Sequence, residues 1–130
     1  MKKGNKGVVM KNYFTVRQVK ISDADKDLPN QLGWDGAIKA SPAWKAKMDN
    51  MRASHDSFDF DSSSLAHYHD CFLVQADDLD DVFRITNLWN DPDAVHTYTP
   101  GHSTSVGDII QDNSSGDQFL VCDFGFKKVA

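Results

Sequence analysis

The chain has no glutamate, only two cysteines and no long apolar run. All 19 acidic residues are aspartates, which favour turns and helix N-caps over helix interiors, so we expect short helices and many loops. A helix that crosses a bilayer needs roughly 20 apolar residues, and no stretch approaches that length, so we expect no membrane span. Cys71 and Cys122 lie in apolar stretches and are expected to be reduced thiols, although a disulfide stays open if their strands are neighbours.

The first residues are basic, as in a signal peptide, but residues 4–7 are polar or glycine where its apolar segment would lie. We therefore expect a cytoplasmic protein, in the host cytoplasm if a phage encodes it. The chain of 130 residues has the size of one domain, and its 40% hydrophobic content suits one core. We expect a single domain, residues 1–130, with residues 1–7 disordered.

Charge is unevenly distributed in this chain, whose net charge is -5. Residues 1–20 carry six bases and no acid, whereas residues 55–93 carry ten aspartates against one base, Arg84. A basic arm can contact nucleic acid or an acidic partner, although many such arms are only solvated ends. The acidic body repels phosphate backbones, which disfavours specific DNA binding.

The apolar pattern predicts an α+β fold with a small antiparallel sheet and a C-terminal β-hairpin. The expected strands cover residues 8–21, residues 68–76, the two arms of a hairpin around a turn at 113–117, and a short last strand through Val129. In the first strand Phe14 and Val16 lie on one face and Val19 and Ile21 on the other, which indicates a bulge or burial on both faces.

Two short helices are expected, over residues 42–53 and 78–89, on one face of the sheet. Residues 22–36 are interpreted as a turn-rich connector, and residues 54–64 as a polar loop or a short edge strand. The predicted core combines the apolar sides of these elements: Phe14, Val16, Trp44, Met48, Phe72, Val74, Leu79, Phe83, Ile109, Leu120 and Phe126.

A group of histidines offers one candidate for metal chemistry. Two imidazoles on one strand and a third from a loop can hold Zn²⁺, although solvated or core-edge histidines show the same spacing. The sequence thus leaves open a small metal-dependent or nucleotide-binding enzyme that uses His55, His67, His69 and Asp70. We otherwise predict no catalytic residue and no cofactor.

Two segments of the second half carry a distinctive pattern. Residues 79–87 read Leu-x-x-x-Phe-x-x-Thr-Asn, residues 102–108 contain Ser-x-Ser-Val-Gly-Asp, and a Gly-Phe pair at 125–126 precedes the end. Over roughly residues 70–130 the chain resembles a group of short phage-, plasmid- and bacterium-encoded proteins that have no established activity. His102 stands where that family usually has arginine. The resemblance implies a phage or mobile-element setting.

The Ser-Val-Gly-Asp segment can be explained without the resemblance. Gly107 allows a turn with positive φ, and Ser105 or Asp108 can bond the free amides of that turn. This favours a structural corner that leads into the hairpin. The alternative is a binding site composed of Asn87, His102, Ser103, Thr104, Ser105 and Asp108.

The function we expect is that of a small non-enzymatic accessory protein of a phage or mobile element, acting by binding a protein of the host. A variant is an acidic inhibitor that imitates nucleic acid with its aspartate-rich span at residues 56–93. The alternative from another class is the small metal-dependent or nucleotide-binding enzyme.

Overall fold

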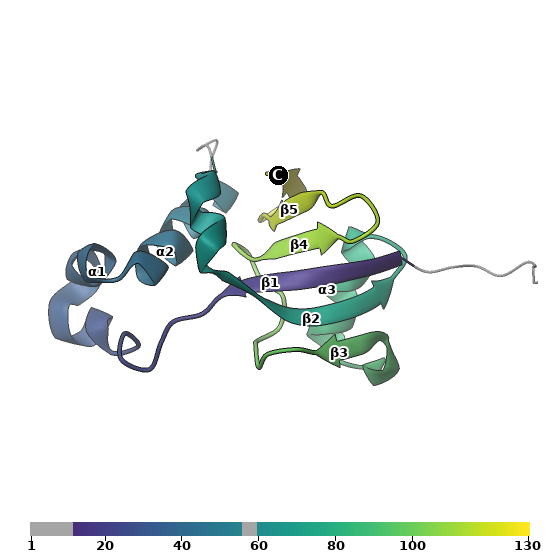
Figure 1. Ribbon diagram of the computed structural model, residues 1–130, viewed down its shortest axis with the longest axis horizontal. Helices are drawn as coiled ribbons and strands as arrows, with labels where there is room; N and C mark the ends of the chain where they lie inside the picture. The colour runs from purple at the N-terminus through teal and green to yellow at the C-terminus, as the bar shows by residue number, and fades with distance from the viewer. Residues whose placement is uncertain (1–11, 56–59) are drawn as a thin grey trace, which may run out of the picture.

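The computed structural model describes residues 12–55 and 60–130, which form an α+β fold around a six-stranded antiparallel sheet (Figure 1). The strands are β1 (Asn12–Val19), β2 (Tyr68–Ala76), β3 (Val95–Thr97), β4 (Ile109–Asp112), β5 (Gln118–Val121) and β6 (Phe126–Lys128). Their order across the sheet is β3-β2-β1-β4-β5-β6. The helices are α1 (Leu28–Ala40), α2 (Pro42–His55) and α3 (Leu79–Leu88), with 3-10 turns η1 (Ser62–His67) and η2 (Pro92–Ala94). The predicted fold class and its C-terminal hairpin, β4–β5, are confirmed.

The helices α2 and α3 match the predicted positions within about two residues at each end. The predicted N-cap of α2 forms, because the Ser41 hydroxyl accepts a hydrogen bond from the Trp44 amide at 3.2 Å. Residues 1–7, expected to be disordered, lie outside the described residues, as do residues 8–11 of the expected first strand. No helix in the described part of the chain has both the length and the apolar character needed to cross a membrane.

Two segments differ from the prediction. The connector expected over residues 22–36 contains the first part of α1, which is kinked at Gly33, with φ 71° and ψ 173°. Pro29 occupies the first turn of α1, and the Asn30 and Gln31 side chains donate to the Asp27 carboxylate, so the helix begins despite two nearby glycines. The second segment, expected as a loop or edge strand, forms η1 over its described part from residue 62 onward.

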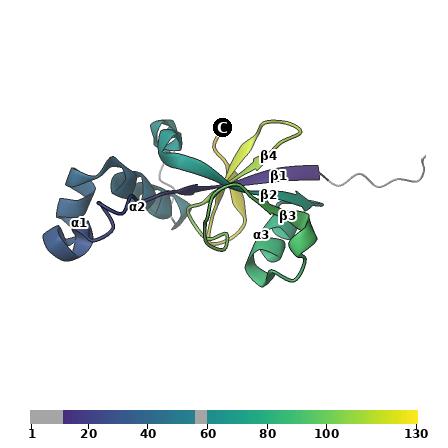
Figure 2. The same cartoon turned by 60° about the horizontal axis from the view of Figure 1, so that its bottom comes forward.

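The two faces of the sheet are covered by different helices. α3 packs on one face, against a cluster that includes Phe14, Val16, Phe72, Val74 and Ile110. A second cluster joins α2 and η1 to residues whose side chains alternate to the opposite face: Val19, Tyr68, Ile109 and Leu120. Figure 2 shows α3 on one side of the strands and α1 and α2 beyond their end.

This arrangement differs from the expectation that both helices lie on one face. The strand β1 exposes apolar side chains to both sides, as the pattern of Phe14, Val16 and Val19 indicates, so each apolar surface needs its own cover. Because α2 reaches only one end of the second face, the middle of that face stays open (Figure 1).

Of the two predicted explanations for the pattern of the first strand, burial on both faces is confirmed, whereas the bulge lies in its partner strand β2. Val16 pairs with Phe72 and Arg17 pairs with Asp70, so Cys71 is an extra residue that bulges from β2. The Cys71 carbonyl accepts hydrogen bonds from the amides of Tyr98 and Thr99, at 2.8 and 3.3 Å. The bulge therefore fixes the chain segment that follows β3. Both cysteines are free thiols.

Most of the predicted core is confirmed, with one error. Six predicted residues are buried: Phe14, Val16, Phe72, Val74, Ile109 and Leu120. Leu79 and Phe126 pack against the first cluster while partly buried, and Trp44 and Met48 are half-buried. Phe83, however, is 37% exposed, and its assignment to the core was wrong. The helix α3 presents Val82, Ile85 and Thr86 to the sheet, which turns Phe83 to the side.

Candidate functional site

The segment 102–108 forms a turn between the end of β3 and the start of β4. Gly107 has φ 94°, so its predicted positive φ is confirmed. The carboxylate of Asp108 accepts a hydrogen bond from the Ser105 amide at 2.9 Å, which is the bond expected for this turn. The Gly107 amide in turn donates to the Val121 carbonyl at 2.9 Å, which ties the turn to β5.

The Thr-Asn pair at the end of α3 holds this turn. The hydroxyl oxygens of Thr86 and Thr104 lie 2.6 Å apart, and both residues are buried. The side-chain amide of Asn87 donates to the Thr104 carbonyl at 3.0 Å. The Trp89 indole donates to the Ser103 hydroxyl at 3.2 Å. The two halves of the sequence pattern thus contact each other directly.

A buried glutamine of β1 fixes the other end of the turn. Gln18 is 1% exposed, and its carbonyl oxygen accepts from the His102 amide at 3.1 Å. Its NH₂ group donates to the His102 carbonyl at 2.8 Å and to the Asp108 carboxylate at 3.0 Å. The sequence prediction missed Gln18. Its polar side chain lies between the apolar residues Val16 and Val19 of an expected strand, and this exception to the apolar pattern could have indicated it.

The carbonyl of Gly107 in this turn is bonded by a tyrosine of β2. Tyr68 donates its hydroxyl proton to the Gly107 carbonyl at 2.6 Å and accepts from the Asn50 amide at 2.8 Å. Burial raises the pKa of Tyr68, so the hydroxyl stays a neutral donor. The structure therefore brings Asn87 together with the five predicted residues of segment 102–108, and their contacts support the structural-corner interpretation.

The carboxyl group of Asp108 is the most perturbed acid of this corner. Burial raises its pKa to about 6, while the Ser105 amide, the His102 imidazole and Gln18 act in the opposite direction. The imidazole nitrogen Nδ1 of His102 lies 3.9 Å from the Asp108 carboxylate. Ionisation of Asp108 therefore lowers the free energy of unfolding, although the hydrogen bonds to its carboxylate offset part of this loss.

Replacing Asp108 by asparagine should remove a dependence of stability on pH between about 4 and 6. In this window the folded chain holds the Asp108 proton and the unfolded chain does not, so the free energy of unfolding falls as pH rises. A pKa raised from 3.8 to about 6 corresponds to roughly 3 kcal/mol. Urea denaturation from pH 4 to pH 7 measures this, with Asp35→Asn as an exposed control. An Asp108→Asn curve parallel to wild type throughout would refute the assignment.

The four residues of the metal alternative lie in separate places. His55 ends α2, where its Nδ1 bonds the Asp123 carboxylate. His67 faces a small hollow beside α2, whereas His69 and Asp70 line a different hollow. Within residues 12–55 and 60–130, no group of three His, Cys, Asp or Glu side chains is placed to hold a metal ion.

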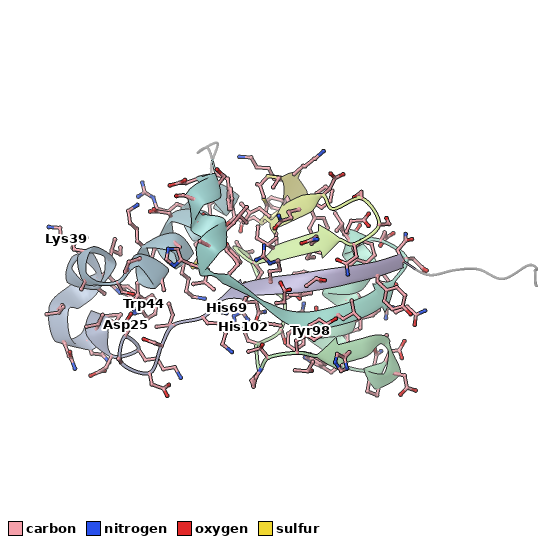
Figure 3. All side chains as sticks on the ribbon, in the orientation of Figure 1. Asp25, Lys39, Trp44, His69, Tyr98 and His102 are labelled. Carbon is pink, nitrogen blue, oxygen red and sulfur yellow. The ribbon has the colours of Figure 1, made fainter. Side chains whose placement is uncertain are left out.

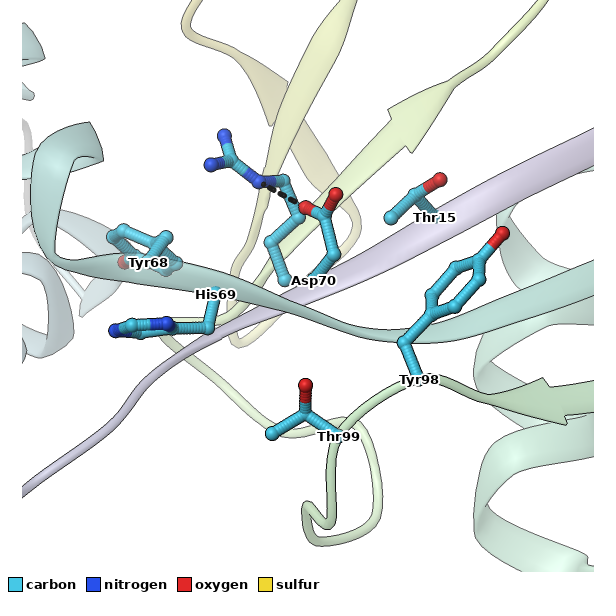
Figure 4. Close-up of a pocket in the computed structure, with 7 residues that line it drawn as sticks. Thr15, Tyr68, His69, Asp70, Tyr98 and Thr99 are labelled. Atoms are coloured by element: carbon cyan, nitrogen blue, oxygen red, sulfur yellow. Dashed lines mark hydrogen bonds and ion pairs between the residues drawn. The ribbon is translucent and has the colours of Figure 1, made fainter.

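The second of these hollows lies on the open face of the sheet (Figure 4). Its volume is about 540 Å³, and it is lined by Thr15, Arg17, Tyr68, His69, Asp70, Tyr98 and Thr99. The Arg17 Nε donates to the Asp70 carboxylate at 2.9 Å, and its Nη1 donates to the side-chain oxygen Oε1 of Gln118 at 2.8 Å. His69 and Tyr98 lie over the strands rather than in the helical layer that contains Trp44 (Figure 3).

A third feature is a groove on the other face, between α3 and the turn that joins β5 to β6. This α3 groove has a volume of about 160 Å³ and is lined by Asp80, Phe83, Val121, Cys122, Asp123, Gly125 and Phe126. Phe124 extends beside it with its side chain 97% exposed. The sequence prediction missed the groove because it placed Phe83 in the core.

Comparisons with protein-family models, with curated proteins and with solved structures find no match for this chain. The resemblance of residues 70–130 to the phage and plasmid group therefore stays a prediction.

Proposed function

We propose that the chain is a non-enzymatic accessory protein of a phage or mobile element, which acts by binding another protein in the α3 groove. The observation that carries the proposal is the pair of exposed phenylalanines at this groove, Phe83 at 37% and Phe124 at 97% exposure. Aromatic side chains presented beside a concave apolar surface are typical of the energetic centre of protein interfaces.

The charge around the α3 groove defines the chemistry of the partner. Asp80 and Asp123 line it, Asp123 being bonded to the His55 imidazole, and Asp77 and Asp78 precede the first turn of α3. An acidic rim around an apolar floor favours a segment that combines apolar side chains with lysine or arginine. We take this partner to be a host protein, because the resemblance of the second half of the chain implies a phage or mobile-element setting.

The aspartates also fit the variant of this function in which the chain is an acidic inhibitor that imitates nucleic acid. Four of them, Asp77, Asp78, Asp80 and Asp81, lie at the start of α3, and Asp80 lines the groove. If the partner is a nucleic-acid-binding protein, DNA should compete with this chain for it, and added salt should weaken the complex. A partner whose binding is insensitive to DNA would leave the α3 groove as a plain protein interface.

Replacing Phe83 and Phe124 together by alanine should weaken partner binding by about 10-fold or more, because each truncation at the centre of an interface typically costs 1–2 kcal/mol or more. The partner is identified by co-purification with the tagged chain from host cells, and calorimetry then measures the affinity of each variant. The melting temperature should change little, since both side chains are exposed.

The matched control is Trp34→Ala, which removes from α1 an aromatic side chain that is 53% exposed, a value between those of Phe83 and Phe124. It should leave the affinity unchanged. If Trp34→Ala abolishes binding while the double phenylalanine variant binds normally, the interface lies on α1 and the α3 groove is not the site.

A further inference from the structure

The hollow on the open sheet face contains polar groups that the fold leaves available. Arg17 uses its Nε and Nη1 for Asp70 and Gln118, so further guanidinium N–H groups remain. Among the described residues, the second carboxylate oxygen of Asp70 and the hydroxyls of Tyr98 and Thr99 have no hydrogen-bond partner. The side chain of Asp70 is 59% exposed, so its free oxygen can accept from a ligand.

The guanidinium donor of Arg17 and the carboxylate acceptor of Asp70 are held side by side in this hollow. The ion pair between Arg17 and Asp70 spans 2.9 Å, and the bond to Gln118 fixes the guanidinium from the other side. The pair has no net charge, and a planar guanidinium next to a carboxylate offers N–H donors and an oxygen acceptor at adjacent positions. This arrangement suits a neutral planar ligand with adjacent donors and acceptors on one edge.

An aromatic wall stands next to this polar edge. Tyr98 is 53% exposed, and its side chain rises from the segment after β3 on the same side as Thr15 and Asp70 (Figure 4). Its position is set on one side by the bond from its amide to the Cys71 carbonyl, and on the other by the His96 ring, which packs edge-on at 5.1 Å. The exposed ring is therefore a fixed surface on which a flat ligand can stack.

We infer that this hollow binds a nucleobase, as part of a free nucleoside or nucleotide, with guanine as the best match. The base stacks on Tyr98, its N1–H and N2–H groups donate to Asp70, and its O6 accepts from Arg17. A volume of about 540 Å³ lies within the usual range for small-molecule sites. The net charge of -5 disfavours a long phosphate backbone, so the ligand is a single nucleotide rather than a strand.

The inference is independent of the proposed protein interface. The hollow is on the face that α3 leaves open, whereas the α3 groove is on the opposite face. Loss of nucleotide binding would therefore leave the protein-binding proposal untouched, and the reverse also holds.

The test is an NMR titration of the full chain with guanosine, adenosine and cytidine monophosphates, and with methyl glucoside as a sugar probe. We expect guanosine monophosphate to shift the amide signals of Asp70, Tyr98 and Thr99, and to bind more tightly than the other probes. Tyr98→Ala should weaken this binding by about 10-fold or more, since stacking typically contributes 1–3 kcal/mol per base, whereas Tyr98→Phe should retain it.

Two further variants separate recognition from general effects. Asp70→Asn should remove the preference for guanine over adenine while the spectrum stays folded. Tyr13→Ala, which removes a 49% exposed tyrosine on the same sheet face outside the hollow, should leave binding unchanged. Four results would overturn the inference: no shift with any nucleotide, equal binding by Tyr98→Ala, preferential binding of methyl glucoside, or tighter binding of an oligoguanylate than of the mononucleotide.

Discussion

Truncation of Ile85 to alanine should lower the free energy of unfolding by roughly 2–5 kcal/mol, the range measured for buried aliphatic residues. Ile85 is 1% exposed and joins α3 to the cluster of Phe14, Phe72 and Ile110 on the sheet. Total stabilities of such domains are typically about 5–15 kcal/mol, so the variant should melt at a much lower temperature or express poorly. Urea denaturation monitored by circular dichroism measures the loss.

The matched control is Phe83→Ala, two positions earlier on the same helix. From the sequence we expected Phe83 to be core and its truncation to cost roughly 3–5 kcal/mol. Its 37% exposure at the edge of the α3 groove instead predicts a loss near or below about 1 kcal/mol. A larger loss for Phe83→Ala than for Ile85→Ala would show that α3 is rotated about its axis relative to the structure described here.

Replacement of Gly107 by valine should destabilise the protein by roughly 4 kcal/mol, because two costs add. At φ 94° any β-carbon is strained, and a β-carbon here would lie 3.2 Å from Cγ of Met51 in α2. Asparagine, which tolerates positive φ better, should be milder than valine at the same position. Thermal and urea denaturation of the two variants measure the difference.

Gly116 in the β4–β5 turn provides the control for backbone strain alone. Its φ of 80° is similar, but a β-carbon there would meet no atom within 4 Å. Gly116→Val should therefore cost only the strain, about 1–3 kcal/mol. Equal losses for the two valine variants would mean that the contact with Met51 contributes nothing, and equal stability of Gly107→Val and Gly107→Asn would remove the strain argument.

The elements that sequence predicts correctly are those with strong local signals. β-branched and aromatic residues mark β1 and β2, and the Ser41-Pro42 pair marks the start of α2. The strand β3 was missed because three residues carry too little pattern, and it forms by pairing with Phe72–Val74 of a distant segment. Phe83 was wrongly assigned to the core because two overlapping apolar faces of α3 are shifted by one residue relative to each other. Only the packing of the helix on the sheet decides which of these faces is buried.

Prediction from local sequence signals is even more limited for the candidate sites. Gly107 and Asp108 could be assigned their turn roles from sequence, because those roles act within a few residues. The contacts of Gln18 with His102, 84 positions away, have no local signal. The hollow on the open sheet face likewise depends on the bulge that brings Tyr98 next to Asp70. No spacing between residues in the sequence indicates this contact.

The bulge at Cys71 also determines how β2 tolerates changes in its length. Side chains of a regular strand alternate, so Tyr68, Asp70, Phe72 and Val74 would all share one face. The extra residue reverses the phase, so the first two face the open side and the last two face α3. Deletion of Cys71 would make Asp70 and Phe72 neighbours in a regular ladder, so each would keep its present face, but the carbonyl that accepts from the amides of Tyr98 and Thr99 would be lost. Removal of the extra residue would therefore release the segment after β3 without turning the side chains of β2.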